Sequence, residues 1–162
     1  MTGETGGNVV LDALRTSPLF GFLESAHLEK LVAFAREVSW PPDRVIFREG
    51  EPDDKLYLVL EGLVALDIYV PGRGRVTILT IGPQEVLGWS AAVPEVEKKT
   101  ASARTLQPTR AIAIDASALH AACEQDHDLG YHVYRTLANV IASRLKATRL
   151  QLLDVYGVSE RT

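Results

Sequence analysis

The sequence is poor in cysteine and has no long apolar run. Its single cysteine, Cys123, excludes an intrachain disulfide framework and a zinc site built from several cysteines, and suits a reducing compartment. No apolar stretch approaches the roughly 18 residues of a membrane span, and the polar, glycine-rich residues 1–8 lack the basic and apolar regions of a signal peptide. We therefore expect a cytoplasmic protein with no membrane contact, whose residues 1–8 are disordered.

An excess of positive charge is also missing. The 17 Lys and Arg residues against 21 Asp and Glu residues give a formal net charge of −4. Domains that hold nucleic acid are usually basic, so we expect no direct DNA binding. With 162 residues, 46% hydrophobic and 23% charged, the chain has the size and composition of one globular domain.

Histidine is missing from the middle of the chain. The four histidines all lie outside residues 44–114, at His27, His120, His127 and His132. A jelly-roll metalloenzyme needs several histidine or carboxylate ligands that project into its barrel, so this alternative is weakly supported. The alanine-rich surroundings of Cys123 favour a small buried residue over a nucleophile. We expect no catalytic residues, no metal and no required cofactor.

The pattern of apolar residues predicts helices at the two ends and strands between them. Leu28 and Ala35 belong to a helical apolar spacing that follows Ser25, a plausible N-cap, and precedes Pro41-Pro42. Short β-rich runs with Gly/Pro turns then fill residues 44–114. This arrangement predicts a mainly β domain, an antiparallel jelly-roll barrel over about residues 38–114 with flanking helices.

Two helices are expected after the barrel, over residues 115–157. Asp115 is a good N-cap for a short helix, and a long one should run from about Asp126 to Tyr156 and end at Gly157. The long helix carries a mostly apolar heptad seam of Tyr134, Ala138, Ile141, Leu145, Thr148, Leu152 and Val155. We interpret the seam as a homodimer contact. The alternative is two packing neighbours within one monomer.

One segment has the pattern of an anion site. Residues 81–92 pass from a strand through a loop into a short helix that starts near Gly88, and a glycine-preceded helix start offers backbone N–H groups to an anion. Lys99 and Thr100 return at the start of the next strand and would close a phosphate cradle. The alternative is a solvated loop, since Glu95 and Glu97 stand beside the lysines.

From Leu14 to Gly157 the chain resembles the cyclic-nucleotide-binding domain of the catabolite activator protein (Crp/Fnr) superfamily. The resemblance rests on the opening Ser17-Pro18-Leu19-Phe20, the strand–turn–strand segment from Ile46 to Gly62, the turn glycines Gly50, Gly62 and Gly82, and the cassette Leu87-Gly88-Trp89 followed by Lys99-Thr100-Ala101. It implies a double-stranded β-helix barrel, preceded by helices and followed by a long dimerisation helix, in one domain over residues 9–157 with a tail at 158–162.

The resemblance also implies a ligand site. Its residues are Leu87, Gly88, Trp89, Ser90, Ala91, Lys99, Thr100, Ala101 and, on the long helix, the purine-contacting Thr148. Trp89 replaces the glutamate that holds the ribose hydroxyl in the family, and Lys99 replaces the arginine that pairs with the phosphate. Losing both contacts costs about 2–4 kcal/mol, on the order of 30- to 1000-fold in affinity. Arg104 is no substitute, because its strand parity is opposite to that of Lys99.

We therefore expect a stand-alone sensor domain that binds a cyclic nucleotide or another small anion at a divergent cassette. Family transcription factors carry a helix-turn-helix domain after the long helix, where only Val158 to Thr162 remain here. The resemblance thus implies a signal passed by the long helix to a partner protein. The alternative is a degenerate domain without a small-molecule ligand, which acts through dimerisation and protein contacts.

Overall fold

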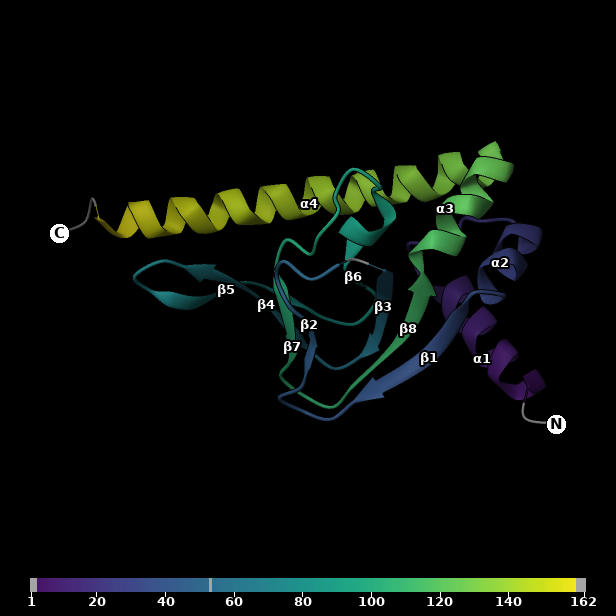
Figure 1. The fold of residues 1–162 in the computed structure, drawn as a ribbon, viewed down its shortest axis with the longest axis horizontal. Coiled ribbons are helices and arrows are strands. Elements are labelled where there is room, and N and C mark those ends of the chain that lie inside the picture. Colours follow the sequence, from purple (N-terminus) through teal and green to yellow (C-terminus); the bar gives the residue numbers. More distant parts are fainter. Residues whose placement is uncertain (1–2, 53, 160–162) are drawn as a thin grey trace.

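A computed structural model describes the backbone of residues 3–52 and 54–159 and the side chains of residues 9–52, 54–151 and 153. Two helices precede the strands, α1 (Gly3–Thr16) and α2 (Ser25–Val32). Two more follow them, α3 (Ala116–Gln125) and α4 (His127–Ser159). The helices gather at one end of the molecule, and α4 runs from there across the strands and beyond them (Figure 1).

The strands between the helices form two antiparallel sheets, ordered β1-β8-β3-β6 and β2-β7-β4-β5. Their bounds are β1 (Ala35–Trp40), β2 (Val45–Phe47), β3 (Lys55–Glu61), β4 (Val64–Val70), β5 (Gly74–Ile81), β6 (Val86–Leu87), β7 (Ser102–Thr105) and β8 (Thr109–Asp115). Consecutive strands change sheet except at the β4–β5 hairpin, which turns at residues 71–73. The predicted antiparallel jelly roll with flanking helices is confirmed.

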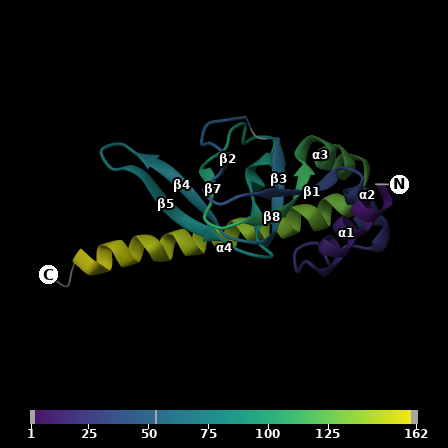
Figure 2. The ribbon, with the colours of Figure 1, turned by 90° about the horizontal axis from the view of Figure 1, so that it is seen from below.

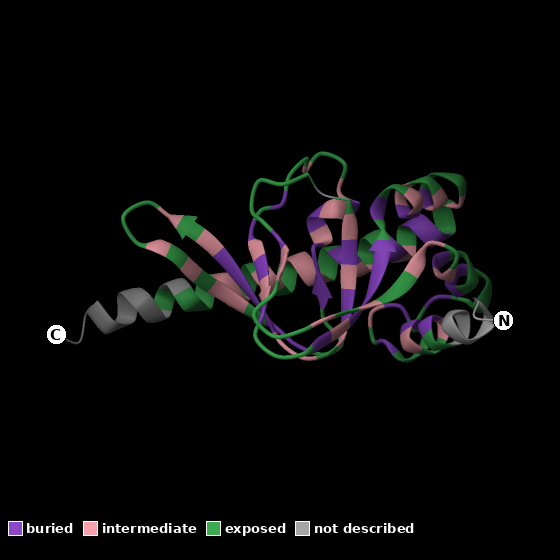
Figure 3. Cartoon of the chain, turned by 60° about the horizontal axis from the view of Figure 1, so that its bottom comes forward, coloured by how far each residue is buried: buried purple, intermediate pink, exposed green. Residues whose placement is uncertain are grey.

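The sheet that contains β3 and β8 is apolar on both faces. The first face packs on the helices and forms the helix-side core, which includes Leu56, Leu58, Ile112 and Ile114 from the strands and Leu14, Leu31, Leu129, Val133 and Leu137 from the helices. The second face meets the other sheet in the inter-sheet core of Phe47, Val59, Val64, Leu66, Ile81, Leu87, Ala101 and Ala103. Figure 3 shows this burial along the central strands, while the tip of the β4–β5 hairpin is exposed.

Among the described side chains of α4, the fully buried ones all lie in its first half. Leu129, Val133 and Leu137 are buried, whereas Leu145 and Leu150 are 51% and 53% exposed. The β4–β5 hairpin projects in the same direction as the second half of α4 (Figure 2).

The heptad seam of α4 is largely uncovered in the single chain. Tyr134, Ala138 and Leu145 are exposed, and Ile141 and Thr148 are half-buried. The side chains of Leu152 and Val155 lie outside the described residues. An uncovered apolar seam is what a homodimer contact requires, and the dimer stays a prediction.

Four sequence-based boundaries are wrong. Residues from Gly3 onward are helical rather than disordered, because α1 buries Val10 and Leu14 in the helix-side core. Glu24, not Ser25, precedes α2, and no side chain caps that helix. Ala35 opens β1 by pairing with Ile114, so the helix predicted from the apolar spacing extended too far along the chain. Finally, α4 continues through residue 157 to Ser159, since a glycine costs a helix interior only about 1 kcal/mol.

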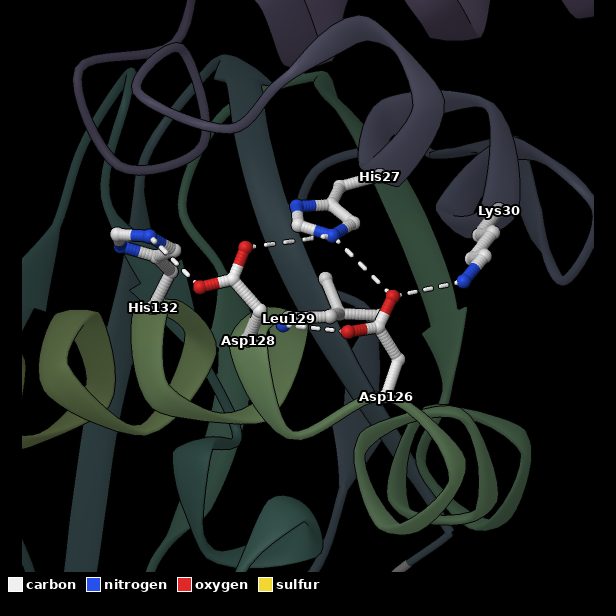
Figure 4. A network of polar contacts seen from close by, with 6 residues as sticks. All are labelled: His27, Lys30, Asp126, Asp128, Leu129 and His132. Carbon is white, nitrogen blue, oxygen red and sulfur yellow. Dashed lines mark hydrogen bonds and ion pairs between the residues drawn. The ribbon is translucent and has the colours of Figure 1, made fainter.

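A polar network fixes the start of α4 against α2 (Figure 4). Asp126 Oδ2 accepts a hydrogen bond from Lys30 Nζ at 2.8 Å and lies 3.2 Å from Nε2 of the buried His27. Asp126 Oδ1 accepts the backbone N–H of Leu129 at 3.2 Å and so caps α4. The hydrogen bond from Lys30, followed by that from Leu129, lowers the pKa of Asp126 to about 2. Asp115 likewise caps α3, as predicted, by accepting the N–H of Ala118.

The network predicts a pH-dependent contribution of Asp126 to stability. Because the folded pKa lies below the usual value of about 3.9, the contribution is present above that value and is lost as the pH falls through about 2. Asp126→Asn should therefore destabilise the protein at pH 7 and have little effect near pH 2. Urea unfolding across this range measures it. Asp12→Asn is the control, since Asp12 is an exposed carboxylate of α1 outside this network, and an Asp126→Asn effect that is independent of pH would contradict the assignment.

Candidate functional site

The cassette begins with a left-handed glycine between β6 and a short 3-10 helix, η1 (Trp89–Ala92). Gly88 has φ +77°, and its carbonyl accepts the N–H of Ala91 at 3.2 Å. A Cβ at this position would stand 3.0 Å from Lys99 Nζ and 3.1 Å from the carbonyl oxygen of Lys55. Both the backbone conformation and the close approach therefore require glycine here.

Lys99 places a buried positive charge against this turn. The residue is only 5% exposed. Its ammonium donates to the carbonyl oxygen of Lys55 at 2.9 Å and lies 4.2 Å from the ring centroid of Phe47. The carbonyl and the π face offset part of the cost of burying the charge. The structure therefore keeps a cation at the cassette, engaged by protein groups.

Trp89 forms the other side of the cassette. It is half-buried and packs against the helix-side core, and η1 as a whole contacts β3 and α3. An indole offers one N–H donor and no acceptor, so Trp89 cannot accept a hydrogen bond from a ligand hydroxyl. Its position fixes η1 to the helical end of the molecule.

The cassette encloses only a very small cavity. Its volume is about 20 Å³, and it is lined by Phe47, Leu66, Gly88, Trp89, Ser90, Lys99, Thr100, Ala101 and Arg144. A water molecule needs about 10–15 Å³ of such space, and organic ligands occupy pockets of roughly 300–1,000 Å³. The described cassette is therefore closed, and a cyclic nucleotide enters only if its walls move apart.

The structure brings together six of the nine sequence-predicted site residues: Gly88, Trp89, Ser90, Lys99, Thr100 and Ala101. Leu87 instead lies in the inter-sheet core. Ala91 is half-buried in η1, and the hydroxyl of Thr148 donates to the carbonyl oxygen of Arg144. Neither of these two lines the cavity. A ligand role for any of the nine stays a prediction.

Sequence reasoning missed three lining residues. Phe47 and Leu66 face the inter-sheet core, and strand parity alone could have placed them there. Arg144 reaches the cavity from α4, where its Nη2 donates to the carbonyl oxygen of Val86. Arg144 precedes Thr148 by one helical turn and so lies on the same face of the helix, and this spacing was the signal that could have placed it at the site. Burial lowers the pKa of Arg144.

Arg104 lies away from the cavity, as its strand parity predicts. Its Nε lies 3.5 Å from Oδ2 of Asp67, and its Nη1 lies 3.8 Å from Oδ1 of Asp43. Asp67 is only 2% exposed, and Thr77 also donates to it, at 2.6 Å. Arg104 thus balances a buried carboxylate on the opposite side of the sheet and is not available to the cassette.

Other chemistries find little support in the described residues. Among them, no group of three or more His, Cys, Asp or Glu side chains is arranged to hold a metal ion. Burial raises the pKa of the Cys123 thiol to about 11, so the thiol is protonated at neutral pH and is a poor nucleophile. None of the described helices is both long and apolar enough to span a bilayer.

Comparison with known proteins identifies the family to which this fold and cassette belong. The cyclic nucleotide-binding domain family model matches residues 37–126, more than half of the chain. The chain therefore belongs to the cyclic nucleotide-binding domain family.

Relatives and solved structures support the same assignment. The chain is 29% identical over 145 residues to the CRP-like cAMP-activated global transcriptional regulator of Mycobacterium tuberculosis, covering 89% of this chain and 62% of that protein. Its fold matches the catabolite activator protein of Thermus thermophilus (TM-score 0.68, 26% identity, 87% of this chain and 63% of that one). A cyclic nucleotide-binding domain of Methylobacillus flagellatus matches with TM-score 0.77 at 23% identity, over 91% of this chain and 83% of that one. The chain thus spans less than two thirds of the first two proteins.

The close approach at Gly88 predicts a stability effect. Gly88→Ala should lower the free energy of unfolding by about 1–3 kcal/mol, because it adds backbone strain at positive φ and a contact with the Lys99 ammonium. Gly72→Ala is the matched control, since Gly72 has φ +85° with nothing within 4 Å of its Cβ position. Urea unfolding should show a larger loss for Gly88→Ala, and equal losses would contradict the steric argument.

Proposed function

We propose that this chain is a sensor domain that binds a cyclic nucleotide, or another small anion-bearing ligand, at its cassette. One observation carries the proposal: the buried ammonium of Lys99 faces the left-handed turn at Gly88, with Thr100 and Ala101 beside it. A cation beside a glycine turn, with small side chains around it, suits a phosphate group. The name of the mycobacterial relative makes cAMP the first ligand to test.

The same geometry implies weak binding. Lysine offers a point charge instead of the planar fork of arginine, and Trp89 supplies no acceptor. The closed cavity of about 20 Å³ must also open before a nucleotide enters. The observed affinity is reduced by the fraction of molecules that are open, so we expect binding well below that of a cassette with glutamate and arginine.

The contacts of the cassette support an output through α4. Arg144 of α4 donates to Val86 in β6, the strand that leads directly into Gly88 and η1, and α4 also contacts η1. Opening the cassette therefore changes the contacts of α4. The exposed Leu145 and Leu150 on its second half offer apolar surface for a homodimer or a partner protein.

A second candidate function is a domain without a small-molecule ligand. The specific observation in its favour is that the protein itself occupies the cassette: Lys99 is held by the Lys55 carbonyl and the Phe47 ring. Such a domain would act through dimerisation and protein contacts of α4. The two candidates differ in what happens when cAMP is added.

Isothermal titration calorimetry with cAMP and cyclic GMP separates the candidates. We expect weak binding of cAMP to the wild type and tighter binding, by roughly 30- to 1000-fold, to the double variant Trp89→Glu/Lys99→Arg. Trp89→Glu/Lys98→Arg is the matched control, because Lys98 is exposed. Thermal unfolding checks that each variant is folded. If neither the wild type nor the double variant binds either nucleotide, the domain without a ligand is favoured.

A further inference from the structure

A second cavity lies outside the cassette, in a groove of about 270 Å³ between α4 and the segment that joins β5 to β6. Its barrel wall includes Ile81 and Val86, which are each 1% exposed, and its helical wall includes Val140 and Ser143. Arg144 borders both the groove and the cassette cavity. Neither Gly88 nor Lys99 lines the groove, so it is a separate space. Figure 1 shows α4 crossing this side of the barrel.

Arg144 gives the groove its charge. A guanidinium carries five N–H donors, and the described structure assigns one of them, from Nη2 to the carbonyl oxygen of Val86. No carboxylate among the described side chains forms an ion pair with Arg144, and burial lowers its pKa. The charge of Glu85 acts on Arg144 without forming a close ion pair among the described residues, and a desolvated cation with unassigned donors is complementary to an anion.

Glu85 limits the charge of that anion. It also lines the groove, is exposed, and accepts the N–H of Gly82 at 3.1 Å. One arginine and one nearby carboxylate suit a singly charged ligand better than a phosphate dianion. The groove volume lies just below the roughly 300 Å³ of typical ligand pockets, so the ligand must be small.

We propose that this groove binds a small amphipathic carboxylate, with the carboxylate on Arg144 and the apolar body against the half-buried Leu19, Leu79 and Val140. This site is additional to the proposed cassette function and does not depend on it. Its ligand would share the guanidinium with the Val86 carbonyl and draw it toward the groove. Binding would therefore alter the contact between α4 and β6 and give α4 an input separate from the cassette.

Octanoate and octanol test the charge dependence of the site. In isothermal titration calorimetry we expect octanoate to bind the wild type at least tenfold more tightly than octanol, which has the same chain without the charge. Arg144→Gln should weaken octanoate binding by about 10- to 100-fold. Arg149→Gln, at an exposed arginine of α4 that does not line the groove, should leave it unchanged. Glu85→Gln keeps an acceptor for Gly82 and should tighten binding.

A matched pair of tryptophan substitutions tests the location. Ser143→Trp fills the groove and should abolish octanoate binding, whereas Ala142→Trp, at the neighbouring exposed small residue outside the groove, should not. The proposal is overturned if the wild type does not bind octanoate, if octanol binds equally well, or if Ser143→Trp binds like the wild type. A cAMP titration of the Trp89→Glu/Lys99→Arg protein, with and without Ser143→Trp, reports on the cassette separately.

Discussion

The arrangement of this molecule depends on one constraint: the sheet β1-β8-β3-β6 is apolar on both faces and must be covered twice. The second sheet covers one face, and the helices cover the other. Leu129, Val133 and Leu137 supply the contribution of α4 to the helix-side core, so this helix buries its apolar side chains along its first half, while Arg144 further on contacts β6. Its remaining length runs in the same direction as the projecting β4–β5 hairpin (Figures 1 and 2).

The same constraint places both cavities at β6. This strand has only two residues, Val86 and Leu87, and they point to opposite cores: Val86 to the helix-side core and Leu87 to the inter-sheet core. Leu87 leads directly into Gly88 of the cassette, and Val86 lines the groove. A buried lysine and a half-buried arginine meet here, and each donates to a backbone carbonyl, Lys99 to Lys55 and Arg144 to Val86. Backbone carbonyl dipoles thus partner both cations in the described structure.

Much of the fold and the glycine turn of the cassette follow from local sequence rules. Gly88 needs no tertiary knowledge, because only glycine readily adopts φ +77°, and the hairpin at residues 71–73 is encoded by its turn residues. Ala35 and Arg144 are different. A helical spacing cannot show that Ala35 will instead pair with Ile114 across the sheet, and the target of Arg144 is a carbonyl 58 residues away in sequence. Both depend on long-range contacts that a single sequence does not display.

Whether the cassette responds to a ligand is decided by a competition between partners for Lys99. In the closed form the ammonium has a carbonyl at 2.9 Å and an aromatic face at 4.2 Å. An anion displaces them only if it interacts with the open form more strongly than with the closed form, since a ligand shifts an equilibrium by no more than its differential affinity. Each 1.4 kcal/mol that favours the closed form lowers the observed affinity tenfold.

Arginine at position 99 would change this balance, because its fork can hold a phosphate with two bonds while a remaining N–H donates to the Lys55 carbonyl. Lysine has three donors on one small ammonium group and must divide a single point charge between the same partners. The substitution at position 99 therefore acts on the opening of the cassette as well as on the strength of the phosphate contact.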